Sequence, residues 1–370
     1  IISCYCNFFI SNYGHVMGAK IEYDMREEIF GHLQKLSFAF YDNQKVGALM
    51  SRITTDLFDI TELMHHGPEN IVISLIKIIG AFVIMMCISP VLTLAAFALV
   101  PVMLAYAYFF NGKMKRAFKR NREKISDINS QIEDNLSGIR VVKSFANEDI
   151  EKEKFKKGNR GFLSAKKNSY FYMGGYHAGL SSFSLLITIL VLMAGAVFIS
   201  SGKTEVTDLI TFLLYINVLT EPIKTLIDFT EQFQNGYTGF ERFVEIMSIE
   251  PDIADGEDAQ EMADIMGTVD FDNVSFRYEE NSGKVLSHIH LHVDAGEYVA
   301  LVGSSGAGKS TLCSLIPRFY DVTGGAVKID GRDIRTWKLK SLREQIGIVQ
   351  QDVYLFVGTV YDNIHYGRPD

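Results

Sequence analysis

The chain has 370 residues, of which 48% are hydrophobic and 12% aromatic, and its formal net charge is −8 at pH 7. This length is sufficient for two or more domains. The acidic balance lacks the positive footprint of a nucleic-acid-binding surface, so we expect no nucleic-acid partner. Long uncharged runs lie almost entirely before residue 222, and an ordinary soluble mixture follows Met247. The composition therefore predicts a membrane part followed by a soluble part.

The first segments are helical by their apolar spacing. The opening IISCYCNFFI is apolar but too short to cross a bilayer, so we interpret it as the end of a span that begins earlier. Apolar residues then recur at three- and four-residue steps from Ile21 to Leu36, which predicts an amphipathic helix that continues into water. Turn residues at 41–47 and a second helical pattern predict a helical hairpin outside the membrane.

The following region has the length and composition of membrane-spanning helices. From Ile78 to Gly112 no residue is charged, and Ser89-Pro90 divides this run in the middle. We predict four complete spans, at about 71–88, 91–110, 179–200 and 208–222. Lysines and arginines crowd 113–124 directly after the second span, which by the positive-inside rule places that end in the cytosol.

The soluble part begins after an acidic, weakly patterned stretch. We predict a transmembrane domain at 1–247, a linker at 248–267 and a nucleotide-binding domain at 268–370. Apolar alternation at 268–278 and 285–293 predicts two strands of a mixed α/β domain.

A phosphate-binding motif occupies the soluble part. Gly303, four residues, Gly308, Lys309 and Ser310 match the P-loop, in which glycines let backbone N–H groups approach phosphate. The apolar run 297–302 before it predicts a strand, and helical spacing follows it. Lys309 would reach the β- and γ-phosphates of ATP, and Ser310 would ligate Mg²⁺. The predicted nucleotide-binding residues of this loop are Gly303, Ser304, Ser305, Gly306, Ala307, Gly308, Lys309, Ser310 and Thr311.

Two groups of histidines admit a metal-binding interpretation, which we do not favour from the sequence. His288, His290 and His292 alternate along a predicted strand, where a solvated strand face explains them equally well. His65 and His66 fall where the membrane part begins, and we interpret them as a polar patch at the membrane boundary.

Longer motifs resemble those of a known family. VSFRYE, GSSGAGKST, LIPRFYDVTGGAVKIDGRDIR and LREQIGIVQQDVYLFVGTVYDNIHYGRPD resemble the nucleotide-binding domain of ATP-binding-cassette (ABC) exporters of the multidrug and lipid type. YDMREEIFGHLQKLSFAFYDNQKVGALMSRITTD and GIRVVKSFANED are similar to the cytosolic loops of that family. The resemblance implies a multi-domain protein, with an all-α transmembrane domain carrying long cytosolic helical extensions and then a partial α/β P-loop nucleotide-binding domain.

The resemblance also implies roles for individual residues. Tyr278 would stack on adenine, and Gln351 would contact Mg²⁺ and the attacking water, with Gln350 as the alternative. The segments 40–47 and 142–149 would be the coupling helices, which transmit closure of the nucleotide-binding domains to the spans. Lys309 and Gln351 are thus the predicted catalytic residues, and Ser310 and Gln351 the predicted metal ligands.

As a function, the resemblance implies a dimer of two half-transporters, identical or different, in the plasma membrane. Hydrolysis of ATP on the cytoplasmic side would drive export of a drug, a lipid or a peptide. Compared with the six transmembrane helices that the resemblance implies for each half, we expect the first to be missing, and no LSGGQ-type signature or Asp-Glu strand end follows the P-loop. We therefore expect an internal piece of an exporter that is not hydrolytically competent alone. The alternatives are a non-hydrolysing, ATP-gated membrane regulator or channel, and an inactive fragment.

Overall fold

The computed structural model describes all residues except 264, 279–282, 351–352 and 369–370. It divides into two compact units. The first unit contains Ile1–Tyr23 and Asp56–Phe240, and the second contains Asp24–Thr55 and Glu241–Asp370.

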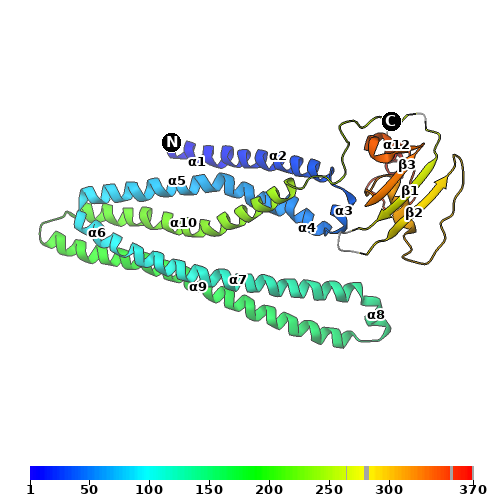
Figure 1. Ribbon diagram of the computed structural model, residues 1–370. Coiled ribbons are helices and arrows are strands. Elements are labelled where there is room, and N and C mark those ends of the chain that lie inside the picture. Colours follow the sequence, from blue (N-terminus) through cyan, green and yellow to red (C-terminus); the bar gives the residue numbers. More distant parts are fainter. Residues whose placement is uncertain (264, 279–282, 351–352, 369–370) are drawn as a thin grey trace. The chain divides into compact units, whose positions relative to one another are not determined.

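The first unit is built from helices (Figure 1). Residues with strong apolar periodicity form long elements, and breaks between them include Ser89-Pro90, Leu99, Gly138 and the polar turn before Val206. Its elements are α1 (Ile2–Phe9), the π-helix η1 (Ile10–Gly14), the start of α2 (His15–Leu33), α5 (Leu57–Ile88), α6 (Pro90–Ala98), α7 (Val100–Ser137), α8 (Ile139–Ser144), α9 (Glu148–Ser200) and most of α10 (Val206–Met247).

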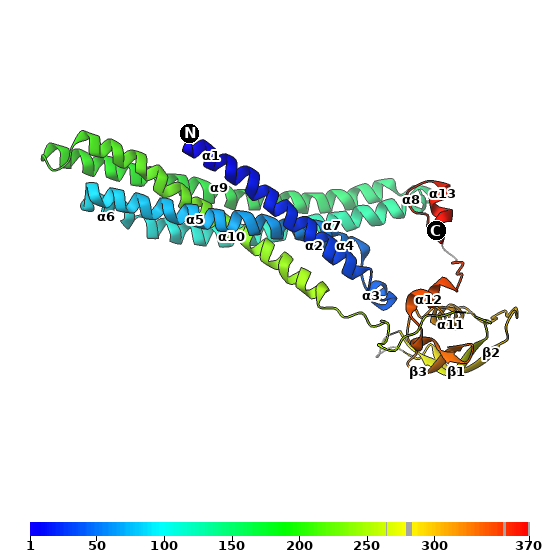
Figure 2. The ribbon, with the colours of Figure 1, turned by 90° about the horizontal axis from the view of Figure 1, so that it is seen from above.

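The four helices that were predicted to contain the membrane spans are present. In the part of the chain that the structure describes, four helical segments are long and apolar enough to cross a bilayer: Val46–Ile88, Pro90–Ser137, Glu148–Ser200 and Val206–Met247. Large apolar side chains such as Ile76, Met193 and Leu214 are exposed on them, as expected for surfaces that face lipid. Helices α7 and α9 run side by side, and both continue well beyond their apolar stretches (Figures 1 and 2).

Side chains from α5, α6, α7, α9 and α10 form the interior of this unit. One cluster includes Met103, Tyr176 and Leu219, and a second includes Met85 and Phe212. The Tyr176 hydroxyl donates a hydrogen bond of 2.9 Å to a carboxylate of α10, which satisfies a polar group inside the bundle.

The second unit contains a small antiparallel sheet. The strands are β1 (Val269–Phe276), β2 (Leu286–Val293), β3 (Gly324–Ile329) and β4 (Arg332–Asp333), in the order β2-β1-β3-β4. The two strands predicted at 268–278 and 285–293 are therefore confirmed. The other elements are the end of α2, α3 (Phe38–Asp42), α4 (Val46–Ser51), the π-helix η2 (Arg52–Asp56), α11 (Lys309–Leu315), η3 (Ile334–Thr336), α12 (Leu339–Glu344) and α13 (Val360–His365).

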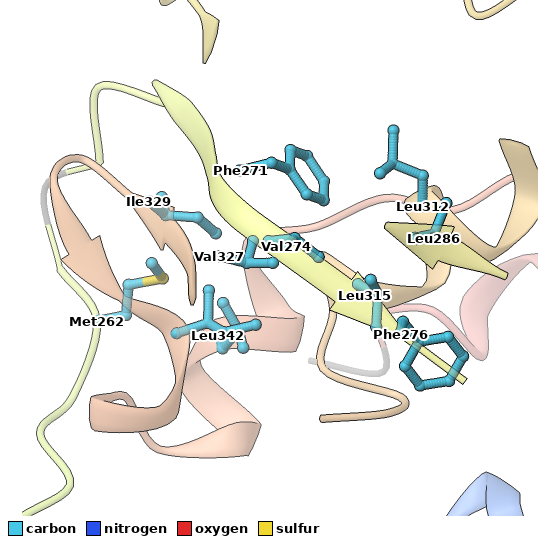
Figure 3. Packing of buried hydrophobic residues seen from close by; sticks show 11 residues of the cluster. Met262, Phe271, Val274, Phe276, Leu286, Leu312, Leu315, Val327, Ile329 and Leu342 are labelled. Atoms are coloured by element: carbon cyan, nitrogen blue, oxygen red, sulfur yellow. The ribbon is translucent and has the colours of Figure 1, made fainter. Parts of the chain in front are cut away.

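One apolar core joins the sheet to α11 and α12. Val274 of β1, Leu315 of α11 and Leu342 of α12 are completely buried, and Val327 of β3 is nearly so. Figure 3 shows these side chains gathered along β1. Met262, which lies in the segment predicted as a linker, is also buried in this core. The P-loop helix is therefore held by a sheet whose strands come both before it (β1 and β2) and after it (β3 and β4) in the chain.

The predicted strand at 297–302 is wrong for the described residues. No strand is assigned there, and Tyr298 and Val302 are almost fully exposed. A strand requires a hydrogen-bonded neighbour, and the four described strands pair only among themselves. An apolar run can indicate a buried strand, but it does not supply the neighbouring strands.

Candidate nucleotide-binding site

The P-loop backbone follows from its glycines. Gly306 and Gly308 have φ values of +83° and +86°, in the left-handed region that side chains rarely tolerate. The Ala307 amide donates to the Ser304 carbonyl at 3.2 Å, which closes the turn. Gly308 is the N-cap of α11, so the loop leads directly into the amino end of that helix.

This amino end suits an anion. No side chain caps α11 within the described residues, so its first backbone N–H groups are available to an external acceptor. The Lys309 ammonium donates to the carbonyls of Gly303 and Ser304, at 3.0 and 2.8 Å. The cation therefore lies within the loop, and Ser310 follows it in the first turn of the helix. The Lys309 ammonium and the backbone N–H groups of α11 suit the phosphates of a nucleotide, and the Ser310 hydroxyl suits a magnesium ion beside them.

The structure brings Tyr278 to this loop, although 33 residues separate it from Thr311. The hydroxyl groups of Tyr278 and Thr311 lie 2.9 Å apart. The Tyr278 side chain is 46% exposed, and its ring meets those of Phe276 and Tyr320 edge to face. A half-exposed aromatic ring beside a phosphate loop can stack on a nucleotide base.

Tyr320 was not identified from the sequence. Its hydroxyl donates a 2.7 Å hydrogen bond to the Asp42 carboxylate of α3, within the second unit. Burial and this carboxylate raise the pKa of Tyr320, so the hydroxyl stays protonated and continues to donate. Phe38 of α3 also contacts Phe319, with ring centroids 4.4 Å apart. In the sequence, the signal that could have identified this contact was the aromatic pair Phe319-Tyr320, which follows α11.

The structure describes only some of the remaining predicted site residues. Gln351 lies outside the described residues, so its predicted role stays a prediction. Gln350 is described and exposed. The predicted coupling segment 40–47 includes the end of α3 and the start of α4, and it adjoins Tyr320 through Asp42. The other coupling segment, 142–149, contains the end of α8 and the start of α9.

The chain matches two family models. One, described as the ABC transporter transmembrane region, covers residues 1–223, and the other, described as ABC transporter, covers residues 286–368. The breaks between spans and the P-loop both fall inside the matched ranges.

Curated relatives agree with this match. The chain is 43% identical to the "Uncharacterized ABC transporter ATP-binding protein YwjA" of Bacillus subtilis (strain 168), over 99% of this chain and 64% of that protein. It is 37% identical to a "Putative multidrug export ATP-binding/permease protein" of Staphylococcus aureus (strain NCTC 8325), over 95% of this chain and 61% of that protein. The chain thus spans less than two thirds of the length of these relatives.

A solved structure has the same fold. A bacterial Atm1-family ABC exporter with ATP bound aligns with 96% of this chain and 62% of its own, at a TM-score of 0.78 and 26% identity.

Proposed function

Because the chain belongs to the ABC transporter family, we propose that it forms one half of an exporter that uses ATP to move a drug, a lipid or a peptide across the plasma membrane. One observation carries the proposal: among the residues described, a P-loop with its lysine inside the loop occurs together with four helices apolar and long enough to cross a bilayer. The P-loop would bind the ATP whose hydrolysis drives transport, and the apolar helices would form the pathway of the substrate across the membrane. The second half-transporter is identical or different, and both lie in the lipid bilayer.

The side chains and backbone of the P-loop would hold ATP by its phosphates. Lys309 contributes a positive charge, and the N–H groups of α11 contribute donors that need no reorganisation when charge develops on the γ-phosphate. Ser310 would hold Mg²⁺ together with Gln351. Bound Mg²⁺ neutralises charge on the phosphate oxygens. Tyr278 would fix the base, which sets the position of the phosphates over the loop.

Contacts of α3 support a route from the nucleotide to the membrane domain. Thr311 of the P-loop helix meets Tyr278, Tyr278 meets Tyr320, and Tyr320 bonds to Asp42. A ring or hydroxyl that shifts on nucleotide binding therefore displaces groups that touch α3. The lysine and arginine cluster at 113–124 supports a cytoplasmic position for the nucleotide-binding domain.

The proposal is tested with the full-length protein in nanodiscs and in proteoliposomes. We expect Mg²⁺-dependent phosphate release from ATP, on the order of 1 to 10 per second. We also expect ATP-dependent accumulation of at least one dye from a panel of amphipathic fluorescent cations, lipids and labelled peptides. Nucleotide binding without phosphate release would favour the non-hydrolysing regulator or channel. Failure to bind ATP would reject both.

Replacing Tyr278 with alanine should weaken ATP binding about fivefold, because an aromatic contact contributes about 1 kcal/mol. Tyr278→Phe keeps the ring and loses only the hydroxyl contact with Thr311, so its affinity should stay near that of the parent. Titration of the full-length protein with a fluorescent ATP analogue measures both. Equal affinities for parent and Tyr278→Ala would contradict the stacking role.

Tyr320→Phe should separate binding from turnover. The variant keeps the ring contacts but loses the hydrogen bond to Asp42, a bond to a charged group worth about 1.5–3 kcal/mol. We expect a several-fold lower kcat for ATP hydrolysis with a KM within twofold of the parent. Tyr366→Phe, which removes an exposed hydroxyl in the same domain, serves as the control. A Tyr320→Phe enzyme with unchanged kcat would show that this bond transmits nothing.

A further inference from the structure

Three histidines from separate parts of the chain meet in the helical unit. His15 is the first residue of α2, and His65 and His66 lie next to each other in α5. Their ligand atoms all lie within 4.8 Å of one another, the only such histidine, cysteine and carboxylate group identified in the described ranges. The ring centroids are 4.0 to 5.3 Å apart. The strand histidines that alternate along β2 form no comparable cluster among the described residues.

The orientation of the His65 ring is set by a hydrogen bond within α5. The ring is buried, and its Nδ1 lies 2.7 Å from the Thr61 carbonyl oxygen. Because a carbonyl only accepts hydrogen bonds, Nδ1 carries a proton, and in the neutral ring the lone pair then lies on Nε2. That Nε2 is buried and has no hydrogen-bond partner among the residues described. Metal-binding histidines typically donate a hydrogen bond from one ring nitrogen to a carbonyl and bind the metal through the other, and His65 has this arrangement.

Two carboxylates of α5 complete a site suited to a cation. Glu62 lies 3.6 Å from His66 Nε2 and 4.0 Å from His65 Nε2, and Glu69 lies 3.2 Å from His66 Nδ1. Steps of three and four residues along α5 place these four side chains on one face of the helix. The face therefore combines imidazole nitrogens with negative charge.

The backbone conformation near His15 lets the start of α2 lie close to the His65 ring of α5. The π-helix η1 ends at Gly14, directly before His15, and such turns are frequent at functional sites. Gly18 lies one turn later, and a Cβ atom there would be 3.0 Å from His65 Nδ1. The absence of a side chain at Gly18 lets α2 come close to the buried ring.

We propose that His15, His65 and His66 bind one divalent transition-metal ion, with Glu62 as the fourth ligand. Zn²⁺ is the best match, because it takes neutral imidazoles and a carboxylate in tetrahedral geometry at about 2.0–2.2 Å. Ligand atoms around one such ion lie about 3.4 Å apart, so the exposed His15 ring moves inward on binding. The ion fastens the start of α2 to α5, two elements about 50 residues apart in sequence.

Zinc binding is measured on the full-length protein in nanodiscs, free of any polyhistidine tag, by titration calorimetry with ZnCl₂ at pH 7.5. We expect one site that His15→Ala weakens at least about tenfold, and that His65→Ala weakens as much. His177→Ala is the matched control, an exposed histidine of the same unit outside the cluster. Equal affinity and stoichiometry in the parent, His15→Ala and His177→Ala would mean adventitious surface binding and would overturn the proposal.

A second measurement does not depend on the buried variant folding well. Ligand binding to the folded state raises the unfolding temperature. Zn²⁺ should therefore raise the unfolding temperature of the parent and of His177→Ala, but not that of His15→Ala, whose replaced ring is exposed. A Zn²⁺-dependent rise of the same size in His15→Ala would also overturn the site.

Discussion

Lys309→Ala is expected to lower the ATP turnover of the full-length protein at least about 100-fold. The Lys309 ammonium lies within the loop, 3.0 and 2.8 Å from two of its carbonyls, so it is already positioned for a phosphate. Loss of one preorganised donor from a site of developing charge costs about 2.7–4 kcal/mol. Phosphate release from Mg²⁺-ATP by the purified protein measures the effect.

The control for this prediction is Lys340→Ala. Lys340 is an exposed lysine of the same domain, and its ion pair with Glu344 is 3.8 Å long and solvated. Its removal should leave turnover within twofold. The unfolding temperature of Lys309→Ala should also stay near that of the parent, because the bonds that it loses lie in an exposed loop. Turnover of Lys309→Ala within twofold of the parent would remove the P-loop assignment.

Gly308→Ala should weaken ATP binding roughly 10- to 100-fold. Gly308 has a φ of +86°, and a Cβ atom there would lie 2.7 Å from Leu286 Cδ2 and 3.3 Å from the Val285 carbonyl. Left-handed strain at a non-glycine residue costs about 1–3 kcal/mol, and the contact with buried Leu286 adds to it. The loop must therefore move, and the amino end of α11 moves with it. Titration with a fluorescent ATP analogue reports the loss.

Two further variants separate strain from steric contact. Gly306→Ala has the same left-handed strain, with a φ of +83°, but a Cβ atom there meets nothing within 4 Å. Gly347→Ala, elsewhere in the domain, has open space and no left-handed backbone. We expect the loss of affinity to increase from Gly347→Ala through Gly306→Ala to Gly308→Ala. If Gly308→Ala bound ATP with the affinity of the parent, the left-handed loop conformation would not be required for nucleotide binding.

The four apolar helices followed from local pattern. Uncharged length predicts a span because a bilayer requires about 20 apolar residues to satisfy every backbone group. The span predicted to end at about 200 ends there, because α9 ends at Ser200 and α10 begins at Val206 after a polar turn. These features depend on residues within one or two turns of each other. The exposed run at 297–302 differs, because a strand depends on neighbours that no local pattern supplies.

The sequence by itself determined the two-part organisation, the spans and the phosphate loop. Each is written in contiguous residues, where composition and spacing act through helix periodicity, burial and glycine conformation. Only the tertiary structure decided which distant groups meet: Tyr278 with Thr311, Asp42 with Tyr320, and His15 with His65 and His66. Sequence spacing carries no information on such pairs, because helix packing and sheet register set the distance between residues far apart in the chain. The histidines interpreted as a boundary patch thereby became a candidate metal site.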